Sequence, residues 1–402
     1  MERFNKYIED AWTLAKAQYQ TKKATHLNAC LGNVSGDMDS VVCSILLGYY
    51  LTYKQGFYEE EKEELDAESI SEERLNKFSM PMINMNQIDL KARSDIIHHL
   101  ENLGIDTDKL PACDVIDLKH YADSNKLKVN LLDHNIPDYT QDFLIDSVVR
   151  LIDHHQDKGG VYPNLEYRDV RFCGSAASLV IKLMTDDSEW KEKLIDKHIA
   201  LLAAAPMLLD TSNFSESLRG NKWDQVDEDQ YKTVKEIAGD HIPADYHDTL
   251  YHKKIDLETN INLGFHLLAR KDYKNFKIND LILGISTIFL QLEVCDKEFK
   301  AEEIKKQLNN IVVEKNLDMY MVLTDYKDAE TDEHKRQILT FSPNEELSNK
   351  LKDMLDNFNE VNLDSIKVGE LNDIKYCHTW QNHSTSYSRK KFEPLIRNYF
   401  EK

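Results

Sequence analysis

The sequence predicts an α/β protein of two domains, and three observations support this fold class. Short segments rich in Val, Ile and Leu alternate in the first half of the chain with segments whose apolar residues recur at helical spacing. Several short segments end in Asp, His or Asn, as parallel strands do when their carboxyl ends hold a site. A polar, acidic stretch at 219–248 then precedes a second set of apolar segments. We expect a mostly parallel sheet in residues 1–230 and a smaller α/β domain in residues 250–402.

The expected elements of the first domain follow one another in strand–helix order. Helices are expected at residues 4–20, 38–51, 92–105, 173–186 and 190–208, and the second of these, "MDSVVCSILLGYYL", is expected to be amphipathic. Strands are expected at "HLNACL" (26–31), "MPMINM" (80–85), "CDVIDL" (113–118), "KVNLLDHN" (128–135) and "VVRLIDHH" (148–155). In the second domain, strands are expected at 281–292, 316–326 and 336–342.

Composition and charge narrow the range of functions. The net charge of −21 argues against a broad basic face for nucleic acid. The longest apolar run, residues 199–209, is too short to cross a membrane, and "MERFNKYIED" does not resemble a targeting signal. The six cysteines form no CxxC pair, so neither disulfides nor a thiolate zinc site is expected. We therefore expect a cytoplasmic monomer without nucleic-acid or membrane partners. The acidic run at 59–73 is read as a solvated surface.

Four apolar segments end in potential metal ligands. These endings contain Asp37 and Asp39, then Asp133, then Asp153 with His154 and His155, and finally Asp210. Because parallel strands end at one edge of a sheet, these groups can meet there, and several close carboxylates tolerate one another only with bound cations. Carboxylates with an imidazole suit Mg²⁺ or Mn²⁺.

Each ending taken alone has an ordinary structural explanation. A single Asp after a strand is usually a turn or helix-cap residue, and a His pair proves little. A second pair, His98 and His99, lies inside a helical segment and is read as one surface and one core residue. The four endings together, in order, carry the metal-site hypothesis.

The motifs resemble those of a known family. "GNVSGDMDS" (32–40), "LLDHN" (131–135), "LIDHH" (151–155) and "LLDTSNF" (208–214) look like the four motifs of the DHH phosphoesterases. "SRKKFEPLI" (388–396) resembles the signature of a DHHA2-type second domain. Such domains occur in family II inorganic pyrophosphatases, yeast-type cytosolic exopolyphosphatases and prune-type proteins. The resemblance implies an active site in a cleft between the two domains.

The resemblance also implies roles for individual residues. Two divalent ions would be held by Asp37, Asp39, Asp133, His154 and Asp210, with Asp133 bridging them. Mg²⁺ is expected, with Mn²⁺ or Co²⁺ as alternatives. His155 would contact substrate phosphate, and Asp153 would orient the imidazoles. Phosphate oxygens would be bound by Lys274, Arg389 and Lys390, and by backbone N–H groups of Gly174 and Ser175 if these do more than begin a helix. A basic channel of Lys271, Lys277 and Lys391 is a further hypothesis, although ordinary solvated lysines are the simpler interpretation.

One departure from the pyrophosphatase pattern separates the subfamilies. Where those enzymes carry a metal-binding His, this sequence has Asn33, as the exopolyphosphatases do, and Asn33 is a candidate for positioning the attacking water. The resemblance therefore implies a metal-dependent exopolyphosphatase that releases orthophosphate from the ends of inorganic polyphosphate. The alternatives are a pyrophosphatase, another DHH phosphodiesterase, or a prune-like regulatory protein; prune-type proteins of animals typically carry Arg in place of His155.

Overall fold

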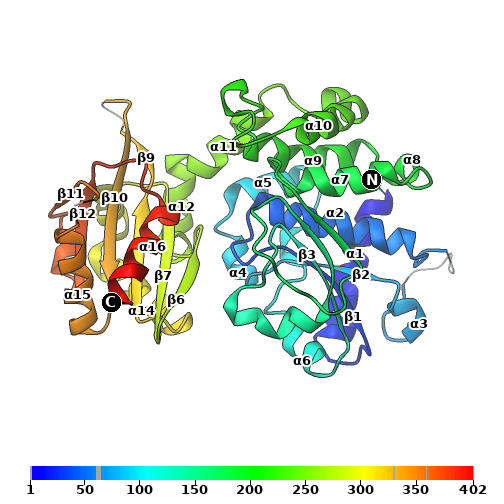
Figure 1. Ribbon diagram of the computed structural model, residues 1–402, viewed down its shortest axis with the longest axis horizontal. Coiled ribbons are helices and arrows are strands. Elements are labelled where there is room, and N and C mark those ends of the chain that lie inside the picture. The colour runs from blue at the N-terminus through cyan, green and yellow to red at the C-terminus, as the bar shows by residue number, and fades with distance from the viewer. Residues whose placement is uncertain (1, 60–64, 329–330, 359, 402) are drawn as a thin grey trace. The chain divides into compact units, whose positions relative to one another are not determined.

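The computed structural model describes residues 2–59, 65–328, 331–358 and 360–401 (Figure 1). The chain divides into two compact units. The first comprises residues 1–90 and 95–252, and the second comprises residues 91–94 and 253–402. Both units are α/β, so the predicted fold class is confirmed. The acidic run at 59–73 lies partly outside the described residues.

The first unit is built on a five-stranded, wholly parallel sheet of order β2-β1-β3-β4-β5. The central strands are nearly completely buried, which explains their uninterrupted runs of apolar residues. The strands are β1 (Leu27–Leu31), β2 (Ser79–Met82), β3 (Leu127–Leu132), β4 (Val148–Asp153) and β5 (Tyr167–Val170).

Helices surround this sheet, and the most central of them is α2 (Met38–Lys54). It packs against β1, β2 and β3 and against helices α7 (Ala176–Asp186) and α9 (Lys197–Asp210). Residues 38–52 are all buried, so the expected amphipathic helix is instead buried on every side. Further α-helices of this unit are α1 (Glu2–Leu14), α3 (Glu72–Leu75), α4 (Gln87–Leu90), α5 (Ser94–Asn102), α6 (Leu118–Asp123), α8 (Lys191–Leu194) and α10 (Gln225–Ala238). Helix α11 (Tyr246–Ile255) begins in this unit and ends in the second.

One strand predicted for this unit was wrong, and one observed strand was not predicted. Residues 113–118, "CDVIDL", form turns that lead into α6, because Ile83 makes only an isolated bridge with Ala112 there. The fifth strand, β5, was not expected, since "YRDV" is polar and only partly buried at the edge of the sheet. The polar stretch at 219–248 is largely helical, with α10 packed on α7 and α9.

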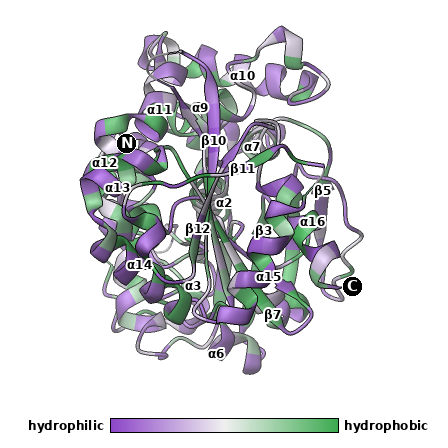
Figure 2. Cartoon of the chain, turned by 90° about the vertical axis from the view of Figure 1, so that its left-hand side faces the viewer, coloured by the Kyte–Doolittle hydropathy of each residue, from purple (hydrophilic) through white to green (hydrophobic). Residues whose placement is uncertain are grey.

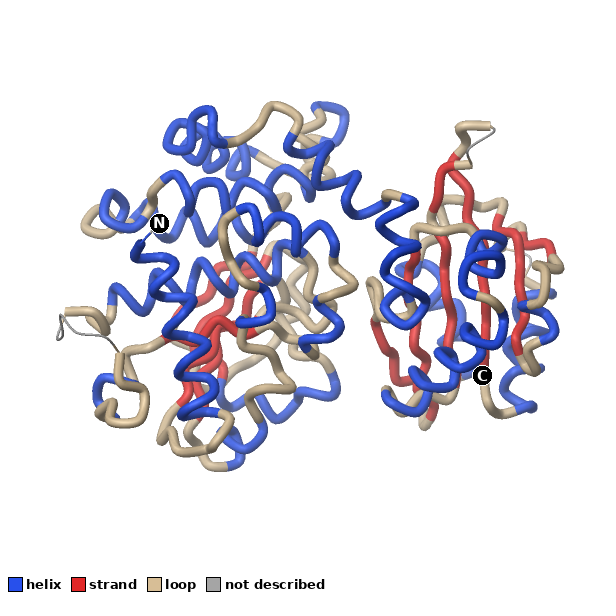
Figure 3. Tube along the Cα trace, turned by 180° about the vertical axis from the view of Figure 1, so that it is seen from behind, coloured by secondary structure: helices blue, strands red, loops and turns tan. Residues whose placement is uncertain are grey.

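The second unit contains a seven-stranded mixed sheet, in which six strands follow the order β11-β12-β10-β8-β7-β6 and β9 pairs with β10. Among the described strands of this unit, β7 and β8 form the one parallel pair. Figure 3 shows helices on both sides of these strands. The strands are β6 (Lys274–Ile278), β7 (Leu281–Ile288), β8 (Met319–Thr324), β9 (Tyr326–Lys327), β10 (His334–Phe341), β11 (Leu363–Ser365) and β12 (Cys377–Asn382). The predicted strands correspond to β7, β8 and β10.

Strand β8 shows how this sheet supports two cores. Met319, Met321 and Leu323 belong to one apolar cluster, while Tyr320 and Val322 belong to the other, because successive side chains point to opposite faces. In Figure 2, hydrophilic and hydrophobic colours alternate along α14 and α15, as expected for helices with one buried face. The helices are α12 (Leu257–Leu268), α13 (Leu292–Phe299), α14 (Ala301–Glu314), α15 (Glu345–Asp356) and α16 (Arg389–Phe400). Among the described residues, no helix is long and apolar enough to cross a bilayer.

His99 is the buried member of the pair in α5, as expected. Its Nε2 lies 3.1 Å from the carbonyl oxygen of Leu202, and its Nδ1 lies 2.6 Å from the hydroxyl of Tyr246. The pKa of His99 is lowered to about 4, chiefly by burial; the contact with the Leu202 carbonyl opposes this shift, and the neighbouring His98 adds to it. The neutral imidazole is therefore the form that fits this core.

We expect His99 to make the first unit unstable in acid. In the unfolded chain the imidazole takes up a proton below its ordinary pKa of about 6.5, whereas in the folded chain it stays neutral down to about pH 4. The free energy of unfolding therefore decreases as the pH falls from about 6.5 to 4, by on the order of 3 kcal/mol. Denaturant unfolding of wild type and His99→Gln at both pH values measures this loss, which should shrink in the variant. His98→Gln is the control, and an equal loss of stability in all three proteins would contradict the prediction.

Candidate metal centre

The first part of the site is the turn between β1 and α2. Asp37 caps α2, accepting a hydrogen bond from the backbone N–H of Ser40 at 3.3 Å. A Cβ at Gly32 would lie 2.6 Å from the side chain of Ser40, so only glycine lets the chain pass this close. The Ser40 hydroxyl is thereby held against Asp133. Asp39, in the first turn of the helix, is buried.

Asp133 lies at the centre of the site, directly after β3. Its backbone takes a left-handed conformation with φ of 61°, and its N–H donates to the carbonyl of Ile152 at 2.9 Å. Carboxylate oxygen Oδ2 accepts hydrogen bonds from Asn33 Nδ2 at 2.6 Å and from Ser40 Oγ at 2.7 Å. Oxygen Oδ1 lies 3.1 Å from His154 Nε2. Asn33 therefore positions the carboxylate at the heart of the predicted site.

His154 and His155 follow β4 and are held differently. His154 Nδ1 lies 3.0 Å from the carbonyl oxygen of Cys173, which directs Nε2 toward Asp133 and, at 3.5 Å, toward Asp39 Oδ2. His155 is about half exposed, and its Nδ1 lies 2.9 Å from Asp153 Oδ1 and 3.5 Å from Asp133 Oδ1. Asp153 thus orients one of the two imidazoles.

Asp39 and a residue that sequence reasoning missed, Asp227, meet at the start of α7. Asp39 accepts hydrogen bonds from Ser175 Oγ at 2.7 Å and from the backbone N–H groups of Ala176 and Ala177 at 2.8 and 3.1 Å. The N–H groups of Gly174 and Ser175 instead donate to the buried carboxylate of Asp227, at 2.7 and 3.3 Å. The expected role of these two N–H groups as phosphate donors is therefore corrected.

Asp210, the last residue of α9, completes the acidic group. Its Oδ2 atom is buried and has no hydrogen-bond partner among the described residues. Three consecutive residues with left-handed φ values of 52–55°, Ser212 to Phe214, turn the chain away immediately afterwards. A buried carboxylate oxygen without a donor is an observation that a bound cation would explain.

The electrostatics of the site also fit a cation. Burial raises the pKa of Asp133 well above its usual value, and the charges of Asp37 and Asp39 raise it further. Burial and the same two charges act likewise on the pKa of Asp210. Burial lowers the pKa of His154, yet the hydrogen bond to Asp133 and the charges of Asp39 and Asp133 outweigh it and raise that pKa. The site therefore carries excess negative charge.

The donor atoms form a set that could hold a divalent ion. One ligand atom from each of Asp133, His154 and His155 lies within 4.8 Å of the others. The carboxylates of Asp39 and Asp210, with that of Asp37, supply the surrounding oxygen donors. Imidazole nitrogen with several carboxylate oxygens suits Mg²⁺, Mn²⁺ or Co²⁺. Binding such an ion would release the proton that the carboxylates hold on His154.

The predicted cationic residues lie in the second unit. Arg389 is the first residue of α16, and its guanidinium donates to the backbone carbonyl of Asp272. The Asp272 carboxylate forms an ion pair with Arg93. Although burial raises the pKa of Asp272, the charges of Lys254, Arg93 and Arg389 hold it well below its usual value. Positive charge is thus concentrated around a single aspartate.

The lysines of this unit differ in exposure. Lys390, at the second position of α16, is exposed, and Lys274, which begins β6, is half-buried. Lys277 and Lys391 are exposed. Lys271, however, is buried, and its Nζ donates to Asn260 Oδ1 at 2.6 Å and to the carbonyl of Lys254 at 2.8 Å. The hypothesis that Lys271 lines a basic channel is therefore wrong.

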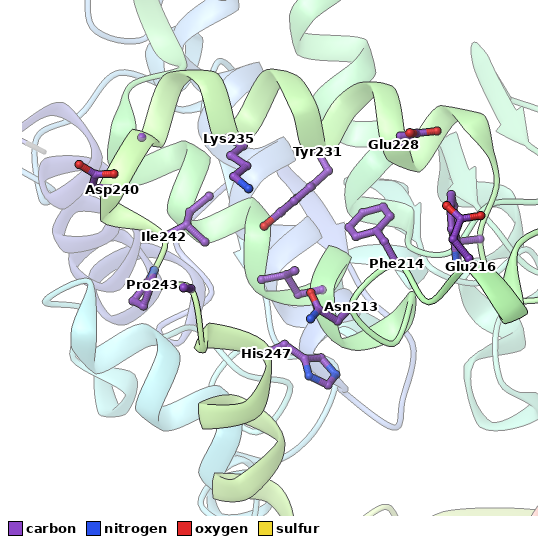
Figure 4. Close-up of a pocket in the computed structure, with 14 residues that line it drawn as sticks. Asn213, Phe214, Glu216, Glu228, Tyr231, Lys235, Asp240, Ile242, Pro243 and His247 are labelled. Atoms are coloured by element: carbon purple, nitrogen blue, oxygen red, sulfur yellow. The ribbon is translucent and has the colours of Figure 1, made fainter.

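A cavity of about 590 Å³ begins beside the end of α9 (Figure 4). Figure 4 shows Tyr231 and Lys235 pointing into it from α10. Leu208 and Asn213, on either side of Asp210 in the sequence, contribute to its wall. None of the predicted metal ligands lines this cavity.

Comparisons with known proteins find relatives that share most of the length of this chain. A "Putative exopolyphosphatase" of Schizosaccharomyces pombe is 25% identical over 91% of this chain and 88% of its own. Human "Exopolyphosphatase PRUNE1" is 23% identical over 97% of this chain and 79% of its own. A crystal structure of a Methanococcus jannaschii "putative family II inorganic pyrophosphatase" covers 94% of this chain and 100% of its own, with a TM-score of 0.57 and 17% identity, and so shares the fold.

Family comparisons match the two units separately. Residues 254–399 match the family described as "DHHA2 domain". Residues 29–207 match "DHH family, N-terminal domain", and this range contains all the predicted metal ligands except Asp210. The chain therefore contains a DHH family N-terminal domain followed by a DHHA2 domain.

Proposed function

We propose that this protein is a divalent-metal-dependent exopolyphosphatase, which hydrolyses the terminal phosphate of inorganic polyphosphate to orthophosphate. The observation that carries the proposal is the group of donor atoms on Asp133, His154 and the half-exposed His155, with Asp39 and Asp210 beside them. Relatives named exopolyphosphatase across most of the chain support the choice of substrate. These relatives support phosphoesterase activity in general, and hydrolysis at the ends of a polyphosphate chain is the more specific part of the proposal.

Neighbouring side chains and one backbone carbonyl orient the candidate metal ligands Asp133, His154 and His155. Asn33 and Ser40 fix one oxygen of Asp133 and leave the other facing the imidazoles. The carbonyl of Cys173 selects the tautomer of His154 that presents Nε2 to the site. Asp153 holds His155, whose exposed half can reach a phosphoryl oxygen. Bound divalent ions would supply Lewis acidity and lower the pKa of water.

Cationic side chains of the DHHA2 domain are proposed to neutralise the phosphoryl oxygens. The resemblance assigns this role to Lys274, Arg389 and Lys390. A guanidinium suits it because its planar donors match two phosphoryl oxygens at once. Because the net charge of the chain is −21, a polyanionic substrate can bind only where positive charge is locally concentrated.

A panel of substrates tests the proposed specificity. Purified protein with Mg²⁺ is given long-chain polyphosphate, tripolyphosphate and pyrophosphate in parallel, and released orthophosphate is measured. We expect release from the first two substrates to exceed release from pyrophosphate. Release from pyrophosphate alone would favour the alternative pyrophosphatase function, and no release from any substrate would favour a regulatory protein.

Asn33 offers a test of metal preference. Its amide nitrogen donates to Asp133, whereas an imidazole at this place could bind a metal ion directly. We expect Asn33→His to shift the preferred ion from Mg²⁺ toward Mn²⁺ or Co²⁺, as measured by hydrolysis rates and by calorimetric titration of each ion. Asn33→Asp, which adds an oxygen ligand instead, is the control. An unchanged order of metals in Asn33→His would remove Asn33 from the metal site.

A further inference from the structure

A second cavity lies at the opposite ends of the strands that carry the metal centre. Its volume is about 340 Å³, and its wall includes Leu27, Lys128 and Arg150. These residues lie near the amino ends of β1, β3 and β4. The candidate metal ligands follow the carboxyl ends of the same strands, so the two sites are separated by the length of the sheet.

Arg150 is unusual among the arginines of this sheet. Arg168 and Arg171, on and beside β5, form ion pairs with Asp157 and Asp169 at 2.7 and 2.6 Å. Within residues 2–59, 65–328, 331–358 and 360–401, the side chain of Arg150 has neither an ion pair nor a hydrogen bond, and its Nε is buried. Its guanidinium lies 4.8 Å from the centre of the Tyr167 ring. A stacked guanidinium keeps its in-plane donors for another partner.

The other polar groups of this cavity favour an anion. Lys128 also lacks an ion pair among the described residues, and the amide side chains of Asn28 and Asn130 lie in the same wall. Asn130 is buried, and its Nδ2 donates to Asn28 Oδ1 at 2.9 Å and to the carbonyl of Ala29 at 3.1 Å, so Asn130 holds Asn28 in place and has no N–H left for an anion. Glu166 is the acidic residue of the wall, and it pairs with neither cation.

The cavity of Figure 4 provides a contrast. Its wall contains Glu216, Glu228 and Asp240 but one lysine, so its local charge repels an anion. At physiological ionic strength, charges beyond about 8 Å are largely screened, and the nearest groups decide which ion binds. The nearest charges at the amino ends of the strands are predominantly positive.

We propose that the cavity between Lys128 and Arg150 binds a small oxyanion of the phosphate class. The guanidinium would supply paired N–H donors and the ammonium would supply a second charge. The amide nitrogen of Asn28, which gives one hydrogen to Ser79 Oγ at 2.7 Å, would contribute its other N–H. The inference does not depend on the proposed hydrolysis, because the site uses none of the residues assigned to that reaction.

Calorimetric titration of the full chain with inorganic phosphate, in the presence of EDTA, tests this site without turnover. We expect Arg150→Met to weaken the binding at least about tenfold, the loss typical of a charge-assisted hydrogen-bonding pair. Lys128→Met should weaken it by a smaller factor, and because Lys128 is exposed this variant should fold normally. Arg168→Met removes the same charge from the neighbouring strand and should leave binding unchanged.

The outcomes separate this site from other phosphate sites. Arg389→Met, titrated in parallel, should retain the binding that Arg150→Met loses. Equal weakening in Arg150→Met and Arg168→Met would show a general charge effect and overturn the proposal. Binding lost only in Arg389→Met, or no binding in wild type, would also overturn it. None of these outcomes bears on whether the protein hydrolyses polyphosphate.

Discussion

Replacing Asp133 with Asn is expected to abolish most phosphate release while leaving the protein folded. Changes to groups that merely orient metal ligands cost about 10–100-fold in affinity or activity, and loss of a central ligand should cost more. Asn has the same shape, so it can still accept hydrogen bonds from Asn33 and Ser40. Orthophosphate release at saturating Mg²⁺, measured beside the wild type, gives the loss.

Unlike its activity, the thermal stability of Asp133→Asn should not decrease. The pKa of Asp133 is raised by burial and by Asp37 and Asp39, which means that its ionised form destabilises the metal-free fold at neutral pH. Thermal unfolding in EDTA should therefore give an unchanged or higher midpoint for Asp133→Asn. Asp10→Asn is the control, because Asp10 is another buried aspartate with a raised pKa but lies in α1. Activity of Asp133→Asn within about tenfold of wild type would contradict the assignment.

Replacing Arg389 with Ala is expected to lower kcat/KM by about 10²–10³-fold. This is the effect, about 2.7–4 kcal/mol, of losing one preorganised donor that stabilises charge in a transition state. Arg389 begins α16, where the helix amino end also favours anions. Steady-state kinetics with tripolyphosphate should show a fall in kcat as well as a rise in KM.

Two further variants distinguish this role from a structural one. Arg397→Ala removes an arginine from the same helix that pairs with Glu393 at 2.6 Å and Glu401 at 3.3 Å, and it should leave kcat/KM nearly unchanged. Arg389→Lys keeps the charge but not the planar fork, so it should restore only part of the rate. A wild-type rate for Arg389→Ala would exclude this arginine from the reaction.

The clustering of the candidate metal ligands was largely predictable because it depends on topology. The carboxyl ends of parallel strands must meet at one edge, so "LLDHN" and "LIDHH" placed Asp133 and His154 side by side, as the 3.1 Å contact shows. Local pattern also gave the N-cap position of Asp37. The family resemblance supplied the individual roles, which spacing alone does not determine.

The errors arose where long-range contacts override a local pattern. "CDVIDL" has the composition of a strand but joins no ladder, since the isolated bridge of Ile83 with Ala112 lies just before it. The polar "YRDV" instead forms β5 because β4 offers it a free edge. Asp227 lies in a polar stretch about fifty residues after Gly174, and only the fold brings its carboxylate to the start of α7. Lys271 reads as a surface residue, yet Asn260 and the carbonyl of Lys254 satisfy its ammonium in the interior.

The hydrogen bonds to Asp39 have a consequence for how rapidly metal ions would be replaced. Its two oxygens already share their charge with the amino end of α7, through Ser175, Ala176 and Ala177. A carboxylate that is partly neutralised in this way binds a cation more weakly than a fully charged carboxylate does. We therefore expect ions on this side of the centre to exchange readily with the surrounding pool, so that the most abundant divalent ion in the cell occupies it.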